Sequence, residues 1–103
     1  MPVDKVEARR WYTKASKRGL STAHTSLGFM YSIGDGGVEQ DLSAAIELYR
    51  KAKEKGDGQG TFNLAWMLSN GKGVEQDKAA ARALYAAAVR VRLLRLRSRE
   101  RER

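Results

Sequence analysis

The chain has 103 residues and a formal net charge of +8, and it contains no cysteine and a single histidine. This length corresponds to one domain, the lack of cysteine excludes disulfides, thiolate metal sites and a cysteine nucleophile, and the lone His24 excludes the usual histidine-ligated zinc sites. No apolar run approaches the roughly 20 residues needed to span a bilayer, and the first residues lack a basic leader followed by an apolar stretch, so we expect no secretory signal and a cytoplasmic location.

Hydrophobic periodicity predicts five helices, at about residues 4–18, 20–33, 41–55, 58–70 and 77–97. The only strand-like feature is a short alternation of valine and arginine at 89–93. Asp4, Asp41 and Asp77 stand just before three of the helices, where an aspartate oxygen can accept from the free amides of the first turn. Gly34 and Gly71 follow two of the helices, where a left-handed residue is needed and glycine adopts that conformation without strain.

The chain also repeats itself. A shift of 37 residues superimposes several pairs of identical residues, and after one extra residue in the first loop a shift of 36 aligns 38–41 with 74–77; the pairs are Tyr12/Tyr49, Gly19/Gly56, Leu27/Leu64, Met30/Met67 and Gly34/Gly71. A period of this length indicates an array of helical repeats.

Small and large residues recur at matching helical positions. Glycine inside a helix costs about 1 kcal/mol relative to alanine, so Gly28 and Gly60 are expected to mark places where two helices approach closely. Large residues at Trp11, Leu48 and Leu84 are expected to fill the space between these contacts. Each helix hairpin would then cover the apolar face of the next one.

A more specific motif runs over residues 11–41. It reads Trp-Tyr-x-Lys-Ala-x-x-x-Gly at 11–19, then Leu-Gly-x-Met-Tyr-x-x-Gly at 27–34, and closes with Gly-Val-x-x-Asp at 37–41. This motif resembles the Sel-1-like repeat, a relative of the tetratricopeptide repeat, over about residues 4–89. The resemblance implies an all-α, short right-handed α-solenoid of antiparallel hairpins, with about five helices and roughly two and a half repeats. The second copy departs from the pattern at Ala65 and Leu68, where glycine and tyrosine are usual.

No motif of enzymatic chemistry accompanies the repeats. The glycine-rich turns at 34–38, 56–60 and 70–74 follow no strand and lack the residues of a phosphate loop or a dinucleotide fingerprint, and the serines lie in no Gly-x-Ser-x-Gly elbow. His24 has no evident partner for acid–base catalysis, so we interpret it as a packing or surface residue. We therefore expect no catalytic residues, no cofactor and no bound metal.

Four side chains form a predicted partner-binding groove: Thr25, Phe29, Phe62 and Trp66. Phe29 and Trp66 align at the shift of 37, and each lies about 200° around its helix from the core leucine of that helix. Thr25 and Phe62 lie one turn earlier on the same side. The resemblance implies that the two equivalent helices carrying these residues line the concave groove. Exposed aromatic rings are typical binding anchors in such a place. The alternative is that these rings pack against the neighbouring hairpin.

The C-terminal segment is strongly basic, because residues 90–103 carry +5 of the net charge. We divide the chain into a repeat domain at 1–96 and a disordered arginine-rich tail at 97–103. The candidate anion contacts are Arg97, Arg99, Arg101 and Arg103. Acidic lipid or nucleic acid would be their partner, although no aromatic residue stands among them to stack on bases. Val91 and Leu94 belong to an apolar stripe left bare where the array ends, which makes them a candidate edge for a homodimer.

The sequence thus predicts a non-enzymatic scaffold or adaptor that binds a peptide or protein through the groove of its repeats. The alternative is a basic accessory factor whose arginine-rich C-terminus contacts acidic membrane or nucleic acid. Deletion of 97–103 separates the two, because only the second predicts that all binding disappears with the tail and falls steeply with salt.

Overall fold

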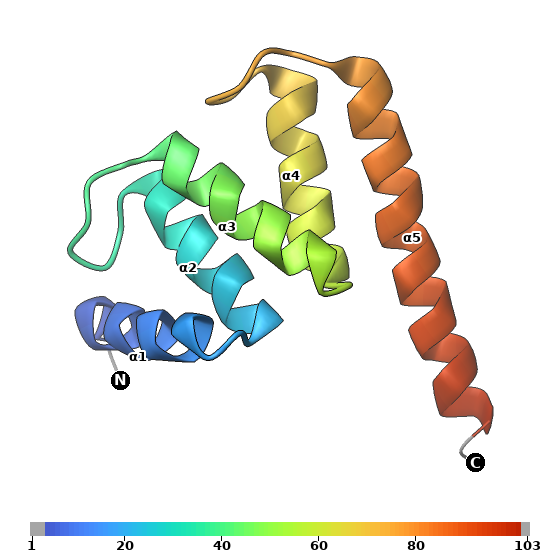
Figure 1. The fold of residues 1–103 in the computed structure, drawn as a ribbon, viewed down its shortest axis with the longest axis horizontal. Coiled ribbons are helices and arrows are strands. Elements are labelled where there is room, and N and C mark those ends of the chain that lie inside the picture. Colours follow the sequence, from blue (N-terminus) through green and yellow to red (C-terminus); the bar gives the residue numbers. More distant parts are fainter. Residues whose placement is uncertain (1–3, 102–103) are drawn as a thin grey trace.

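The computed structural model describes residues 4–101, which form five helices and no strand. The helices are α1 (Lys5–Lys17), α2 (Ser21–Ile33), α3 (Leu42–Glu54), α4 (Gly58–Asn70) and α5 (Lys78–Arg101). Each helix packs against the next one along the chain, as Figure 1 shows. The predicted right-handed α-solenoid of helix hairpins is confirmed. The alternating valines and arginines at 89–93 lie within α5 and are helical.

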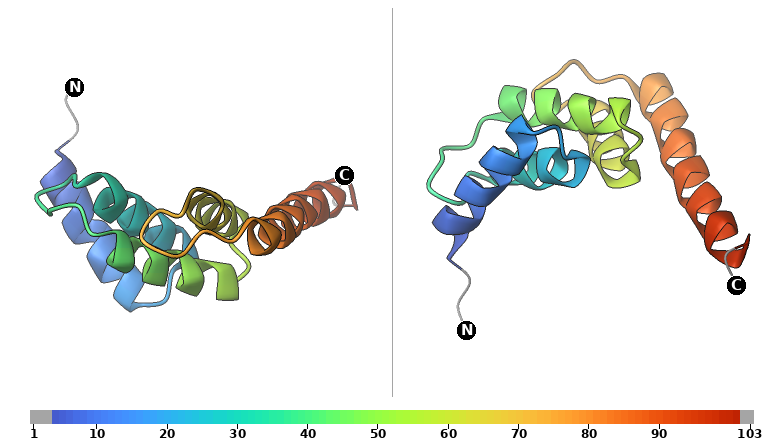
Figure 2. Two further views of the ribbon diagram at one scale, coloured as in Figure 1. Left: turned by 90° about the horizontal axis from the view of Figure 1, so that it is seen from above. Right: turned by 60° about the horizontal axis from the view of Figure 1, so that its bottom comes forward.

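The stack of helices is curved. α2 and α4 contact each other directly, whereas in the described part of the chain no such contact joins α1 to α3 or α3 to α5. The side formed by α2 and α4 is therefore the inner, concave side. Figure 2 shows the helices following one another along this curved path, with α1 and the end of α5 that follows α4 on opposite sides.

Aspartate side chains cap the starts of three helices, and glycines end two helices, where the sequence predicts. The carboxylates of Asp4, Asp41 and Asp77 each accept from the backbone amide three residues on, at 3.1, 3.0 and 2.9 Å. Gly34 and Gly71 end α2 and α4 with φ of 72° and 64°, a left-handed conformation that other residues adopt only with strain. These residues fix the lengths of the helices and hence the register of the hairpins.

The core centres on α3, which packs between α2 and α4. Ala45, Ile46 and Tyr49 of α3 are buried against Leu64 and Met67 of α4. Tyr49 is 2% exposed, and a Cβ added at Gly28 of α2 would lie only 2.8 Å from its ring. Glycine at this position therefore allows the tyrosine ring to lie directly on the helix backbone, as its place inside the helix predicts.

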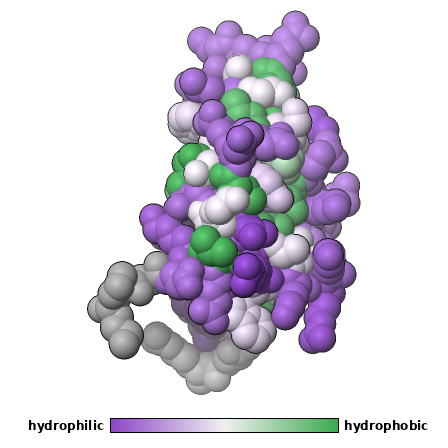
Figure 3. All heavy atoms as spheres, turned by 90° about the vertical axis from the view of Figure 1, so that its left-hand side faces the viewer, coloured by the Kyte–Doolittle hydropathy of each residue, from purple (hydrophilic) through white to green (hydrophobic). Residues whose placement is uncertain are grey.

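Trp11 does not fill the core, contrary to expectation: it is 64% exposed, and the Lys14 ammonium lies 5.4 Å from the centre of its ring. Leu48, which occupies the same repeat position, lies against α2, the helix before its own. α1 is the first helix that the structure describes, so nothing described covers the corresponding side of Trp11. Figure 3 views this end of the molecule, which is mostly hydrophilic with small separate hydrophobic patches.

α5 is longer than the sequence predicts. It continues to Arg101 rather than ending near residue 97, so the described part of the predicted disordered tail is helical and its exposed arginines lie on a helix. The division of the chain at residue 96 remains a prediction. Within residues 4–101 no helix is long and apolar enough to cross a membrane.

Candidate protein-binding groove

A groove opens on the concave side between α2 and α4. Phe29 and Ile33 of α2 face Phe62 and Trp66 of α4, and Tyr49 and Met67 lie at its base; the other lining residues are Ser32, Gln40, Leu42, Asn63 and Lys72. Its volume is about 580 Å³. The four wall residues are each about half exposed, with exposed fractions of 54% for Phe29, 52% for Ile33, 46% for Phe62 and 48% for Trp66. The repeat thus places equivalent apolar side chains on two adjacent helices.

Phe62 has a second role, because it also packs against the last helix. Its ring lies edge-on to Tyr85 of α5, with ring centres 5.1 Å apart. The alternative that the aromatic side chains pack against the neighbouring hairpin therefore applies to Phe62 in part. Among residues 4–101, neither Phe29 nor Trp66 forms an aromatic pair of this kind.

Polar groups are fixed at the base and rim of the groove. Burial raises the pKa of the Tyr49 hydroxyl, and the nearby Ser32 and Asn63 side chains oppose that rise. The Gln59 side chain donates to the Asn63 amide oxygen at 2.8 Å, and the Gln40 side chain donates to the Ser32 carbonyl at 2.9 Å. The groove therefore combines apolar walls with the side-chain amides of Asn63 and Gln40, which can hydrogen-bond a peptide backbone.

Thr25 is not part of the groove, and this prediction is wrong. The residue is 8% exposed, and its hydroxyl donates to the Asp57 carboxylate at 2.7 Å. The start of α4 covers it, since Gly60 brings α4 close enough that an added Cβ would lie 2.8 Å from the threonine oxygen. Thr25 therefore joins one hairpin to the next.

The sequence analysis missed Asp57, which receives this hydrogen bond. Asp57 is 5% exposed and also caps α4, since its carboxylate accepts from the Gln59 amide at 3.0 Å. Its position just before α4 is a recognisable capping signal. Ile33 of the groove was missed as well, although it follows Phe29 by four residues and so shares its helix face.

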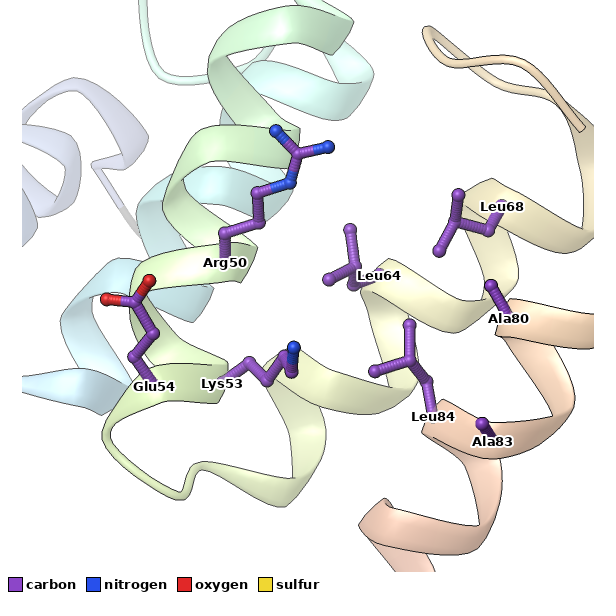
Figure 4. Close-up of a pocket in the computed structure, with 8 residues that line it drawn as sticks. All are labelled: Arg50, Lys53, Glu54, Leu64, Leu68, Ala80, Ala83 and Leu84. Atoms are coloured by element: carbon purple, nitrogen blue, oxygen red, sulfur yellow. The ribbon is translucent and has the colours of Figure 1, made fainter. Parts of the chain in front are cut away.

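A second hollow lies on the outer side of the solenoid, between α3 and α5. Figure 4 shows Arg50, Lys53 and Glu54 of α3 on one side and leucine and alanine side chains of α4 and α5 on the other; these are Leu64, Leu68, Ala80, Ala83 and Leu84. Its volume is about 440 Å³. Leu68 takes the place that Tyr31 has in the first repeat, so the smaller side chain leaves space there.

His24 is a packing residue. It is 4% exposed, and its Nδ1 lies 2.6 Å from the Ser16 hydroxyl of α1. Burial lowers its pKa, and the positive charges of Lys51 and Lys55 lower it further. The ring is therefore neutral at physiological pH. Among the residues described, no three histidine, aspartate or glutamate side chains lie close enough to hold a metal ion.

The two residues of the predicted oligomer edge differ in exposure. Val91 is partly buried, and its Cγ1 lies 3.5 Å from where a Cβ at Gly58 would be, so it covers the start of α4. Leu94 is 58% exposed. Arg97 and Arg99 are exposed on α5.

Of the other two candidate anion contacts, Arg101 is the last residue of α5 and Arg103 lies outside the described residues. A homodimer and contacts with anions remain predictions.

Comparison with known proteins identifies the repeats. The family model described as Sel1 repeat matches residues 1–20, 21–57 and 58–90. Two of these matches begin at α2 and α4, the helices that line the groove. Each complete repeat is therefore a groove helix followed by an outer helix, and α1 is the outer helix of a partial repeat.

Curated relatives are much longer than this chain. It is 33% identical over 82 residues to the ERAD-associated E3 ubiquitin-protein ligase component HRD3B of Arabidopsis thaliana. The aligned region covers 80% of this chain and 13% of that relative. The related component HRD3A of the same plant is 35% identical over 75 residues, covering 73% of this chain and 11% of the relative.

Solved structures agree on the fold. A Sel1 repeat protein from Oxalobacter formigenes superimposes with a TM-score of 0.81 at 34% identity, over 85% of this chain and 36% of that one. A protective antigen of uropathogenic Escherichia coli strains, which has an SLR fold, superimposes with a TM-score of 0.76 at 39% identity, over 82% of this chain and 18% of that one. With the repeat matches along most of its length, this chain belongs to the Sel1 repeat family.

Proposed function

We propose that this chain is a non-enzymatic interaction module that binds an extended peptide segment of a protein partner in the groove between α2 and α4. The observation that carries the proposal is the set of half-exposed apolar side chains facing one another across that groove, Phe29 and Ile33 against Phe62 and Trp66. Large aromatic side chains in a partly desolvated groove dominate binding energies at protein interfaces. The names of the curated relatives, components of ubiquitin-ligase complexes, are consistent with a module that works by binding proteins.

The polar groups favour a peptide over a purely apolar ligand. A peptide needs apolar pockets for some side chains and hydrogen-bond partners for its backbone. The apolar wall residues supply the first, and the side-chain amides of Asn63 and Gln40 supply the second. Lys72 lines the same groove and adds one positive charge, which favours a carboxylate in the bound segment. The cytoplasmic location remains a prediction from the sequence.

Selection from a displayed random-peptide library tests this proposal. For the selected peptides, we expect the double substitution Phe29→Ala/Trp66→Ala to weaken binding by about 30-fold or more, because truncating such anchors typically costs about 2 kcal/mol or more. Phe62 is left unchanged because its ring supports α5. Titration calorimetry measures the affinities.

The matched control is Trp11→Ala, which removes an exposed tryptophan from α1, away from the groove. We expect it to change the affinity by less than about twofold. An equal loss of peptide affinity in the double variant and in Trp11→Ala would contradict the proposal. Unchanged binding by the double variant would contradict it as well. Melting curves for each variant show whether the fold is intact.

A further inference from the structure

The second half of α5 extends past the rest of the fold. α5 packs on α4 through Ala81, Leu84, Ala88 and Val91, which share one helix face and are buried or partly buried. At 1.5 Å per residue its 24 residues span about 36 Å, whereas the 13 residues of α4 span about 20 Å. Because Val91 already lies over Gly58, the first residue of α4, the residues that follow project beyond it. Figure 1 shows α5 continuing past the end of α4.

An apolar seam runs along this part of α5. Val89, Leu93 and Leu96 are 57%, 55% and 47% exposed, and Ala86 precedes them on the same side. The spacing of 3, 4 and 3 residues is that of positions a, d, a and d of a heptad written abcdefg. These are the positions that a helix buries against a partner helix, and no other described helix covers them.

Arginine occupies every position beside the seam. In the same register, Arg90 and Arg97 are the e positions and Arg92 and Arg99 are the g positions, and all four are exposed. No aspartate or glutamate occurs between residues 78 and 99. The e and g side chains of a helix pair lie across from each other and determine which partner is accepted. A partner for this seam needs acidic residues there.

We propose that residues 86–99 of α5 pair with an acidic amphipathic helix of a protein partner, at a site separate from the groove. The seam residues would pack against the apolar positions of that helix, and the four flanking arginines would face its glutamates or aspartates. Pairing with a second copy of this chain is disfavoured, because arginine would face arginine at each flanking position.

The shape of the seam also disfavours a lipid surface. Val89, Leu93 and Leu96 fall within about 60° of the helix circumference, narrower than the apolar face of about 100° or more on a typical amphipathic surface helix. Arg95 lies away from the seam, so positive charge surrounds the helix instead of bordering one broad apolar face. Single-stranded nucleic acid is disfavoured because no aromatic side chain lies in the seam.

Two designed helical peptides test the proposal with the full chain. Both carry leucine at a and d; one has glutamate at e and g, and the other has lysine. We expect the chain to bind the glutamate peptide at least about tenfold more tightly than the lysine peptide. Reversing the charge of all four arginines (R90E/R92E/R97E/R99E) should invert that preference. Fluorescence anisotropy measures both affinities.

A matched pair of single substitutions separates a seam from general attraction to charge. Arg97→Glu, beside the seam, should weaken binding of the glutamate peptide by about two- to fivefold, while Arg95→Glu, two residues away and off the seam, should weaken it less. Equal weakening by the two variants would overturn the proposal. So would tighter binding to phosphatidylserine vesicles or single-stranded RNA than to the peptide. The groove variant Phe29→Ala/Trp66→Ala should bind the glutamate peptide like the wild type.

Discussion

Replacing Gly60 by valine is expected to destabilise the domain by about 3 kcal/mol or more, because the valine side chain would overlap atoms of the neighbouring helices. A Cβ added at Gly60 would lie 2.5 Å from the Ala52 Cβ and 2.8 Å from the Thr25 hydroxyl oxygen. Both neighbours belong to packed helices, so relieving the overlap requires α4 to move away from α2 and α3. For a domain of this size the melting temperature should fall by roughly 15 °C, as measured by circular dichroism.

Gly58→Ala is the matched control at the start of the same helix. A Cβ there would lie 3.5 Å from the Ala88 carbonyl and from the Val91 side chain, an ordinary contact distance. Its effect on the free energy of unfolding should stay within about 0.5 kcal/mol. If the Gly60→Val variant were as stable as the Gly58→Ala variant, this result would contradict the close approach of the two hairpins at Gly60.

The second large effect is expected from Asp57→Ala, which should cost about 2 kcal/mol of stability. The substitution removes the cap of α4, typically worth about 1 kcal/mol, together with the hydrogen bond from Thr25, which lies in the interior between the hairpins. A buried bond to a carboxylate contributes more than an exposed one. Urea denaturation gives the difference in free energy.

Asp41→Ala provides the comparison, because Asp41 is exposed and caps α3 through the Ala44 amide. This variant should lose only the capping contribution, about 1 kcal/mol. A double-mutant cycle of Asp57→Ala with Thr25→Val isolates the bond between the hairpins. A coupling energy near zero would show that Thr25 and Asp57 act independently, contrary to the geometry described.

Local signals in the sequence were enough to predict most of the fold. Aspartate before a periodic run and glycine after it mark helix ends, and the repeat of these signals marks the hairpins. Phe29 and Trp66 were recognised as groove candidates because they lie on the side of the helix opposite the core leucines. Helical periodicity alone therefore predicts which face a residue occupies.

What the sequence did not predict depends on which helices lie next to each other. Thr25 lies on the same helix face as Phe29, but the approach of α4 at Gly60 buries it. Trp11 matches Leu48 in the repeat, yet no described helix covers its side of α1. The extension of α5 to Arg101 was also missed, because a run rich in charged residues near the end of a chain looks like a solvated tail.

Fluorescence of single-tryptophan variants tests the proposed groove most directly, since Trp66 and Trp11 are the only tryptophans of the chain. Trp11→Phe leaves Trp66 in the groove, and Trp66→Phe leaves Trp11 on α1. On addition of a library-selected peptide, the emission of Trp66 should shift to shorter wavelength as the ring loses contact with water, and the emission of Trp11 should stay unchanged. A shift in Trp11 alone, or binding without any change in Trp66, would contradict binding in the groove.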